Sequence, residues 1–164
     1  MSLILGIDVG ISGGIALLDG DKLVAVHDMP TVSKTVGGKK KRRIDARELF
    51  LLLQFEKLSH AFVEIVTARP NQGVSSMFAF GQASGIAEAI AWVMTPDVTG
   101  VRPATWKKHF DLIGKDKSAS RELAIAKWPE HADRFKRVKD DGRAEAALIG
   151  LWGYECITQS KRQS

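Results

Sequence analysis

Two acidic residues lie inside stretches that otherwise have the composition of buried β-strands. Asp8 interrupts the apolar run 3–9, and Glu64 interrupts the apolar run 61–66. A buried carboxylate without a partner costs several kcal/mol by order of magnitude, so each needs a cation or hydrogen-bond donors beside it. Mg²⁺ prefers carboxylate oxygens and keeps open positions for water and phosphate. Asp8 alone would be typical of a turn or cap residue, but the pair predicts a divalent-metal site.

Two further acids lie at the start of the helix expected over residues 142–157. Asp141 and Glu145 are four residues apart and share one helical face, which continues into apolar residues. An N-cap or first-turn role would explain Asp141 or Asp140, but not Glu145. Asp140 is open as a ligand in place of Asp141. The candidate catalytic and metal-ligating residues are Asp8, Glu64, Asp141 and Glu145.

Four converging carboxylates have the chemistry of a two-metal nuclease. Two Mg²⁺ ions about 3.5 to 4 Å apart activate a water molecule and stabilise the leaving oxygen during phosphodiester hydrolysis. We therefore expect two Mg²⁺ ions in the active site, with Mn²⁺ able to substitute.

The strands that would position these acids follow the order of an α/β sheet. Short apolar runs at 3–9, 15–18 and 23–26, joined by tight turns, predict three antiparallel strands. The runs 61–66 and 97–101 predict two more. The first of these should lie parallel to strand 3–9, because a connection through a helix returns the chain in the same direction. The expected fold is α/β, a five-stranded mixed sheet with three antiparallel and then two parallel strands, flanked by helices.

Helices are expected between and after the later strands. One starts at Ile44 or Asp45, and a long one is capped by Ser75 and runs to about Met94. Pro70 and Gly73 mark the loop before the long helix. Three more are expected over 105–110, 118–128 and 142–157.

The composition fits one globular domain spanning residues 1–164. A length of 164 residues with 45% hydrophobic and 26% charged residues is within the usual range for one domain. A single cysteine and four scattered histidines exclude a disulfide scaffold and a zinc finger. No apolar run approaches the roughly 18 residues that a bilayer span needs, and no signal-peptide pattern is present. We therefore expect a cytoplasmic protein without membrane association.

Basic residues concentrate in two segments, although the net charge of the chain is only +5. Residues 34–47 hold seven basic residues and one acid, and we expect residues 37–43 to form a mobile loop. Residues 102–121 hold six basic residues and two acids. Such segments neutralise DNA phosphates, although a solvated face would equally explain the 39–43 run. The candidate DNA-binding residues are Lys39, Lys40, Lys41, Arg42, Arg43, Lys107, Lys108, Lys115 and Lys117.

The four tryptophans, Trp92, Trp106, Trp128 and Trp152, all lie in predicted helical segments. Large aromatic residues at such positions usually pack in a core or an interface. We therefore expect packing roles for them rather than stacking against bases.

These segments resemble the RuvC family of Holliday-junction resolvases, in the ribonuclease-H-like superfamily, and especially its phage and prophage members. The runs 4–10, 63–66 and 141–146 are similar to the family's first strand, fourth strand and closing helix, which carry its catalytic acids. Residues 71–85 resemble the loop and helix used at its dimer interface, and residues 101–108 and 114–118 resemble a segment whose lysines approach DNA. The resemblance implies a homodimer that makes paired nicks across a four-way junction, in a bacterial or phage-infected cell.

The chain also differs from the bacterial members of that family. Gly142 stands three residues before Glu145, where they carry a second Asp, and Thr67 stands where they carry an aromatic that wedges into the junction. Phe78 or Phe80 is able to take the place of that aromatic, although core packing is the more typical role of each.

The predicted function is Mg²⁺-dependent cutting of four-way DNA junctions to leave 5′-phosphate ends. One alternative is an ATPase of the actin or sugar-kinase type, which has a similar first strand. Such proteins clamp a nucleotide between two domains, and 164 residues hold only one, so no nucleotide cofactor is expected. The other alternative is a branched-DNA-binding module without catalysis, whose affinity would fall steeply with salt.

Overall fold

The computed structural model describes residues 2–65, 67 and 73–163. Five strands form one sheet in the spatial order β3-β2-β1-β6-β7. Their bounds are β1 Leu3–Asp8, β2 Gly14–Asp19, β3 Lys22–Asp28, β6 Leu58–Glu64 and β7 Val98–Val101. Strands β1, β2 and β3 are antiparallel, β6 is parallel to β1, and β7 is parallel to β6. The predicted mixed sheet is confirmed.

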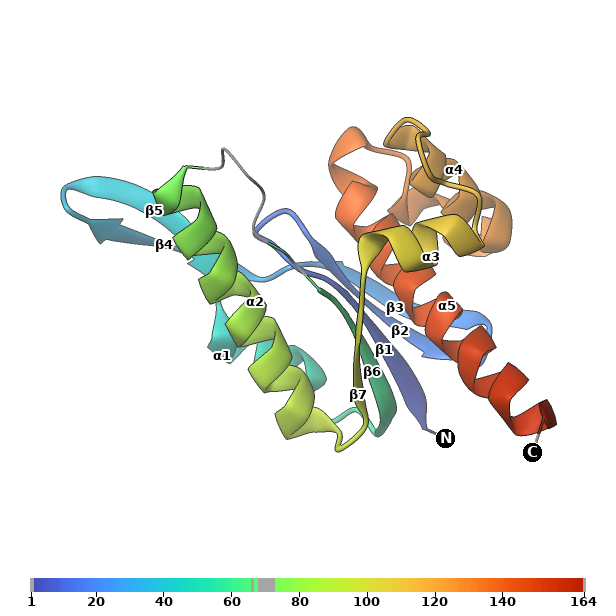
Figure 1. The fold of residues 1–164 in the computed structure, drawn as a ribbon. Helices are drawn as coiled ribbons and strands as arrows, with labels where there is room; N and C mark the ends of the chain where they lie inside the picture. Colours follow the sequence, from blue (N-terminus) through green and yellow to red (C-terminus); the bar gives the residue numbers. More distant parts are fainter. Residues whose placement is uncertain (1, 66, 68–72, 164) are drawn as a thin grey trace.

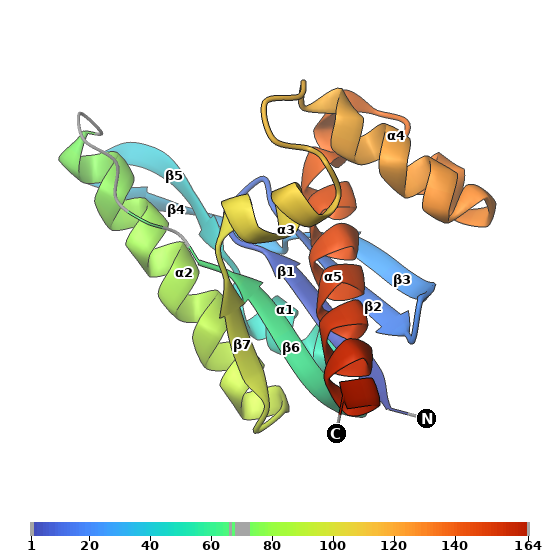
Figure 2. The ribbon, with the colours of Figure 1, turned by 45° about the vertical axis from the view of Figure 1, so that its right-hand side comes forward.

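Helices cover both faces of this sheet, as Figures 1 and 2 show. Helices α1 and α2 lie on one face, and α3, α4 and α5 lie on the other. Their bounds are α1 Ala46–Leu53, α2 Val74–Met94, α3 Pro103–His109, α4 Ser118–Lys127 and α5 Asp141–Gln163, with 3-10 turns at Pro129–Arg134 and Val138–Asp140.

Each face of the sheet has its own apolar core, and β1 contributes to both. Ile4 packs in the core beneath α5, whereas Leu5 and Ile7 pack in the core beneath α1 and α2. Because side chains alternate along a strand, Asp8 points to the same face as Ile4. The acidic residue at the end of β1 is therefore directed toward α5.

Helix α5 lies unusually close to β1 because small residues line the contact. A Cβ added at Gly6 would lie 2.2 Å from the carbonyl oxygen of Ala146 and 2.7 Å from the amide nitrogen of Gly150. Any larger residue at Gly6 would push the helix away from the strand. This approach places the first two turns of α5, including Glu145, beside the end of β1.

The segment expected to be a mobile basic loop is a β-hairpin, so that prediction was wrong. Strands β4 (Thr31–Val36) and β5 (Lys39–Ile44) pair with each other as a second, two-stranded sheet. Gly37 and Gly38 both have positive φ, 58° and 73°, as a two-residue hairpin turn requires. The hairpin extends from the sheet beside the first turns of α2 (Figure 1). Arg42 ties it to the turn after β1 by donating to the carbonyl of Ile11 at 2.8 Å.

The expected helix start at Asp45 agrees with the structure, whereas the expected cap at Ser75 does not. Asp45 caps α1 by accepting hydrogen bonds from the amides of Arg47 and Glu48. Helix α2 instead begins at Val74, with Gly73 as its N-cap, and Ser75 lies within its first turn. Val66 and the predicted loop residues Pro70, Asn71 and Gln72 lie outside the described residues.

Helix α2 is more apolar than expected from the sequence. By length and composition it is the one helix among the described residues that would be able to cross a bilayer, although its most apolar window has a mean hydropathy of only 1.2. It packs against the sheet through Ala83, Ala87 and Ala91. One such helix on a sheet is weak evidence for a membrane span.

Candidate metal and nucleic-acid site

Three carboxylates meet at the ends of two inner strands of the sheet, beneath the start of α5. Asp8 ends β1, Glu64 ends β6, and Glu145 lies in the second turn of α5. One oxygen atom of each lies within 4.8 Å of the others. Parallel pairing of β1 and β6 brings the two strand ends together, and the close packing of α5 adds Glu145. The sequence predicted all three residues, and the cluster is able to hold a metal ion.

The cluster is electrostatically strained without a cation. Burial raises the pKa of Asp8 well above its ordinary value, and the charges of Glu64 and Glu145 raise it further. Burial also raises the pKa of Glu64, although the indole of Trp106 acts in the opposite direction. Crowded, buried carboxylates bind either protons or a cation. Their oxygen-only chemistry fits a hard divalent ion.

Helix α3 supplies partners for two of the three acids. The indole Nε1 of Trp106 donates to Oε1 of Glu64 at 2.9 Å, and Nζ of Lys107 lies 3.1 Å from Oε1 of Glu145. The sequence predicted Lys107 as a DNA contact and Trp106 as a packing residue. Trp106 is fully buried, as expected, but its bond to Glu64 was missed. A buried indole needs an acceptor, but the sequence contains no signal that identifies Glu64 as that acceptor.

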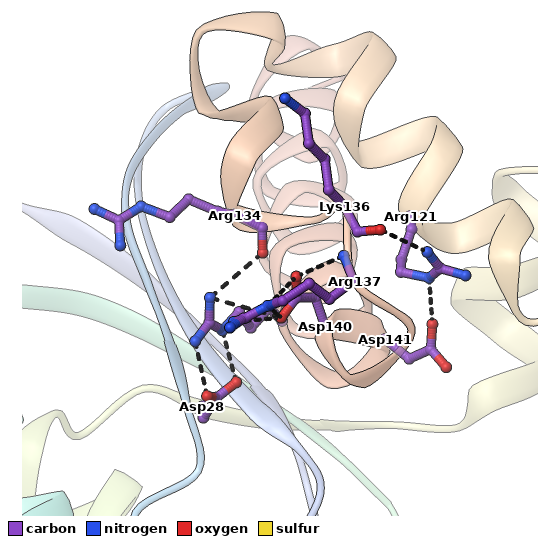
Figure 3. A network of polar contacts seen from close by, with 8 residues as sticks. Asp28, Arg121, Arg134, Lys136, Arg137, Asp140 and Asp141 are labelled. Carbon is purple, nitrogen blue, oxygen red and sulfur yellow. Dashed lines mark hydrogen bonds and ion pairs between the residues drawn. The ribbon is translucent and has the colours of Figure 1, made fainter.

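The fourth predicted ligand, Asp141, is held apart from the cluster by an arginine. Arg121 of α4 donates from Nε to Oδ1 of Asp141 at 2.6 Å, as Figure 3 shows. Asp141 nevertheless lines the same hollow as Asp8 and Glu145. Its role as a ligand stays a prediction.

Asp140, the residue left open as a substitute ligand, anchors the start of α5 instead. Its side chain is fully buried and accepts hydrogen bonds from the amide and the guanidinium of Arg137, at 2.9 and 2.8 Å (Figure 3). Burial raises the pKa of Asp140, but the bonds from Arg137 and the charges of Arg143 and Arg137 together outweigh this effect and lower it. Beside it, Arg143 forms two bonds to Asp28 at the end of β3. Asp140 therefore belongs to a structural network rather than to the acidic cluster.

Two hollows open onto Asp8, and predicted DNA-binding residues line both. The first has a volume of about 610 Å³ and contains Arg42 and Lys117 together with Asp8, Asp141 and Glu145. The second, of about 760 Å³, lies between β5 and α2 and contains Lys41, Arg42 and Arg43. The other predicted contacts, Lys39, Lys40, Lys108 and Lys115, are exposed. Cationic walls around an acidic floor would allow a phosphate backbone to approach.

Two aromatic residues that line the second hollow do not have the role expected from the sequence. Core packing was the expected role of Phe78 and Phe80, but Phe78 is 65% exposed and Phe80 is 37% exposed. Both rings line the hollow from α2. They are available to a ligand or to a partner chain.

Comparisons with known proteins define the fold. No model of a known protein family matches this chain, and no curated protein matches it in sequence. Among solved structures, Thermus thermophilus RuvC in complex with a Holliday junction substrate is similar, with 17% identity, 96% of each chain covered and a TM-score of 0.57. A second structure of T. thermophilus RuvC has 16% identity, the same coverage and a TM-score of 0.54.

These similarities support two statements about architecture. The sheet order and the helices on both faces give the chain a ribonuclease-H-like α/β fold. Within that class its fold is RuvC-like along nearly its whole length, as the resemblance in sequence predicted.

Proposed function

We propose that this chain is a divalent-metal-dependent endonuclease that resolves four-way DNA junctions. The observation that carries the proposal is the cluster of Asp8, Glu64 and Glu145 beside hollows with cationic walls: Asp8 lines two such hollows, and Glu145 lines one of them. The RuvC-like fold adds support, because one of the similar RuvC structures holds a Holliday junction substrate.

The acids of this site would hold Mg²⁺, or Mn²⁺ in its place. Asp8, Glu64 and Glu145 would be ligands, and Asp141 would join them to complete a site for two ions once Arg121 turns to a DNA phosphate. When bound, the ions would activate the attacking water and stabilise the leaving 3′ oxygen, which gives 5′-phosphate ends. Arg42 and Lys117, which line the hollow beside the acids, would neutralise phosphates next to the cut.

The junction would be recognised by its shape, with a homodimer presenting two active sites. A two-fold dimer matches the symmetry of a four-way junction. The exposed apolar side chains of α2 support a protein contact there: Val74, Met77, Phe78, Trp92 and Val93 are all exposed. This role of α2 and a cytoplasmic location in a bacterial or phage-infected cell are parts of the proposal.

A cleavage panel tests the proposal. Synthetic four-way junctions, forks and linear duplexes of matched sequence are incubated with the protein in Mg²⁺, in Mn²⁺ and in EDTA. We expect paired nicks in the junction with either metal and none in EDTA. Salt-sensitive binding of the junction with no cleavage in either metal would support the binding module without catalysis instead. Light scattering on the same preparation tests the dimer.

A further inference from the structure

Trp106 contacts one acid of the cluster and the lysine that pairs with a second acid. Its indole Nε1 donates to Oε1 of Glu64 at 2.9 Å. Its ring face lies 5.0 Å from Nζ of Lys107, within the range of a cation–π interaction. Lys107 in turn forms the ion pair with Glu145. One fully buried side chain is therefore connected to two of the three acids.

We propose that Trp106 is a positioning residue that fixes the orientation of Glu64 and of the Lys107–Glu145 pair for metal binding. The proposal rests on the metal-dependent site proposed above. A carboxylate that accepts a charge-assisted hydrogen bond at one oxygen loses rotational freedom, so its second oxygen is presented in one direction. Outer partners of this kind orient the groups that bind a metal directly.

The burial of Trp106 keeps its hydrogen bond to Glu64 in place. An indole with no exposure to solvent cannot exchange its acceptor for water, so breaking the bond would leave a buried donor unpaired. Lys107 is only partly exposed, with 31% of its side-chain surface accessible. The ring beneath its ammonium group limits where that group is able to move.

Trp128 provides a matched control within the same chain. It is 2% exposed, and its Nε1 donates at 2.9 Å to the backbone carbonyl of Asp21, which is not part of the acidic cluster. Trp106→Phe and Trp128→Phe each remove one buried indole donor and keep an aromatic ring. A purely structural role for Trp106 predicts the same consequences for both variants.

The first test measures Mn²⁺ binding to the protein without DNA by titration calorimetry, with thermal unfolding as the check on folding. We expect Trp106→Phe to weaken Mn²⁺ binding by about 10-fold to 100-fold, the usual effect of losing an outer partner of a metal ligand. Trp128→Phe should bind Mn²⁺ as the wild type does. Equal Mn²⁺ affinity in the wild type and Trp106→Phe would overturn the positioning role.

The second test does not need a folded Trp106 variant. The indole N–H resonances of the four tryptophans are followed in a ¹⁵N-labelled sample, and that of Trp106 is assigned by eliminating the others with Trp→Phe variants. Adding Mg²⁺, or introducing Glu64→Gln, should move the Trp106 resonance and leave that of Trp128 in place. A Trp106 resonance that responds to neither change overturns the proposal.

The two proposals fail in distinguishable ways. A wild-type protein that binds no Mn²⁺ overturns both the metal site and the positioning role. Mn²⁺ binding and junction cleavage by the wild type, together with unchanged binding in Trp106→Phe, overturns the positioning role alone.

Discussion

Replacing Asp8 with asparagine should stabilise the metal-free protein, although it should abolish the proposed activity. The oxygens of Asp8, Glu64 and Glu145 lie within 4.8 Å of one another. At an effective dielectric constant of about 20, two like charges at that separation repel by roughly 3 kcal/mol. Attraction to Lys107 and partial protonation offset part of this repulsion, so we expect a net gain of about 1 to 3 kcal/mol for Asp8→Asn at neutral pH.

The pH dependence of this gain has a definite sign. The pKa of Asp8 is raised in the folded protein, chiefly by burial and then by its acidic neighbours. At a pH between the pKa of Asp8 in the unfolded chain and its higher pKa in the folded protein, the folded state therefore binds more protons than the unfolded state. The stability of the wild type falls as the pH rises through that interval. Asp8→Asn has no carboxyl group at this position, so its stability does not fall in this way. The advantage of the variant should shrink as the pH falls toward the ordinary pKa of an aspartate.

Thermal unfolding in EDTA, repeated with Mg²⁺, measures the effect. A gain of about 1 kcal/mol corresponds to a rise in Tm of roughly 2 to 4 °C for a protein of this size. Mg²⁺ should raise the Tm of the wild type, because it binds the folded state, and should change that of Asp8→Asn much less. The control is Asp97→Asn, an exposed residue just before β7. A lower Tm for Asp8→Asn than for the wild type in EDTA at neutral pH would refute the reasoning.

Two other substitutions test the packing and the cationic walls. Gly6→Ala should lower the free energy of unfolding by about 1 to 3 kcal/mol through overpacking, because its Cβ would lie 2.2 Å from the Ala146 carbonyl oxygen. Urea titrations measure this change, with Gly85→Ala as the control because a Cβ there meets nothing within 4 Å. Equal stability of the two variants would contradict the packing argument. Arg42→Gln should weaken junction binding at low salt and reduce the salt dependence by about one phosphate contact. The control is Lys22→Gln, a change at the exposed start of β3. Equal junction affinities of the two variants in a binding titration would show that Arg42 is not part of the interface.

The sequence predicted the part of the site that backbone topology determines. Asp8 and Glu64 meet because each ends a strand and the two strands pair in parallel. The order of the elements predicts this pairing, because a connection through a helix returns the chain in the same direction. Glu145 follows from its helical spacing and from the small residues of α5. These features depend on local pattern and on a few general rules, so they are readable from one chain.

The remaining features depend on contacts between side chains or on strands without an apolar pattern. The bond from Trp106 to Glu64 spans 42 residues, and the bond from Arg121 to Asp141 spans 20. No periodicity encodes either of them. Strand β5 is mostly exposed and carries five consecutive basic residues, so it lacks the alternation that identifies a strand. The Gly37–Gly38 turn was the available signal for that hairpin.

Cleavage of a labelled four-way junction by Asp8→Asn and by Asp97→Asn, under single-turnover conditions in Mg²⁺, tests the central claim most directly. Junction affinity is measured in parallel without divalent metal. We expect both variants to bind the junction, Asp97→Asn to cut at the wild-type rate, and Asp8→Asn to be slower by at least about 100-fold, because even an outer partner of a metal ligand is worth 10-fold to 100-fold. Equal cleavage rates for the two variants would contradict the assignment of the acidic cluster as the catalytic centre.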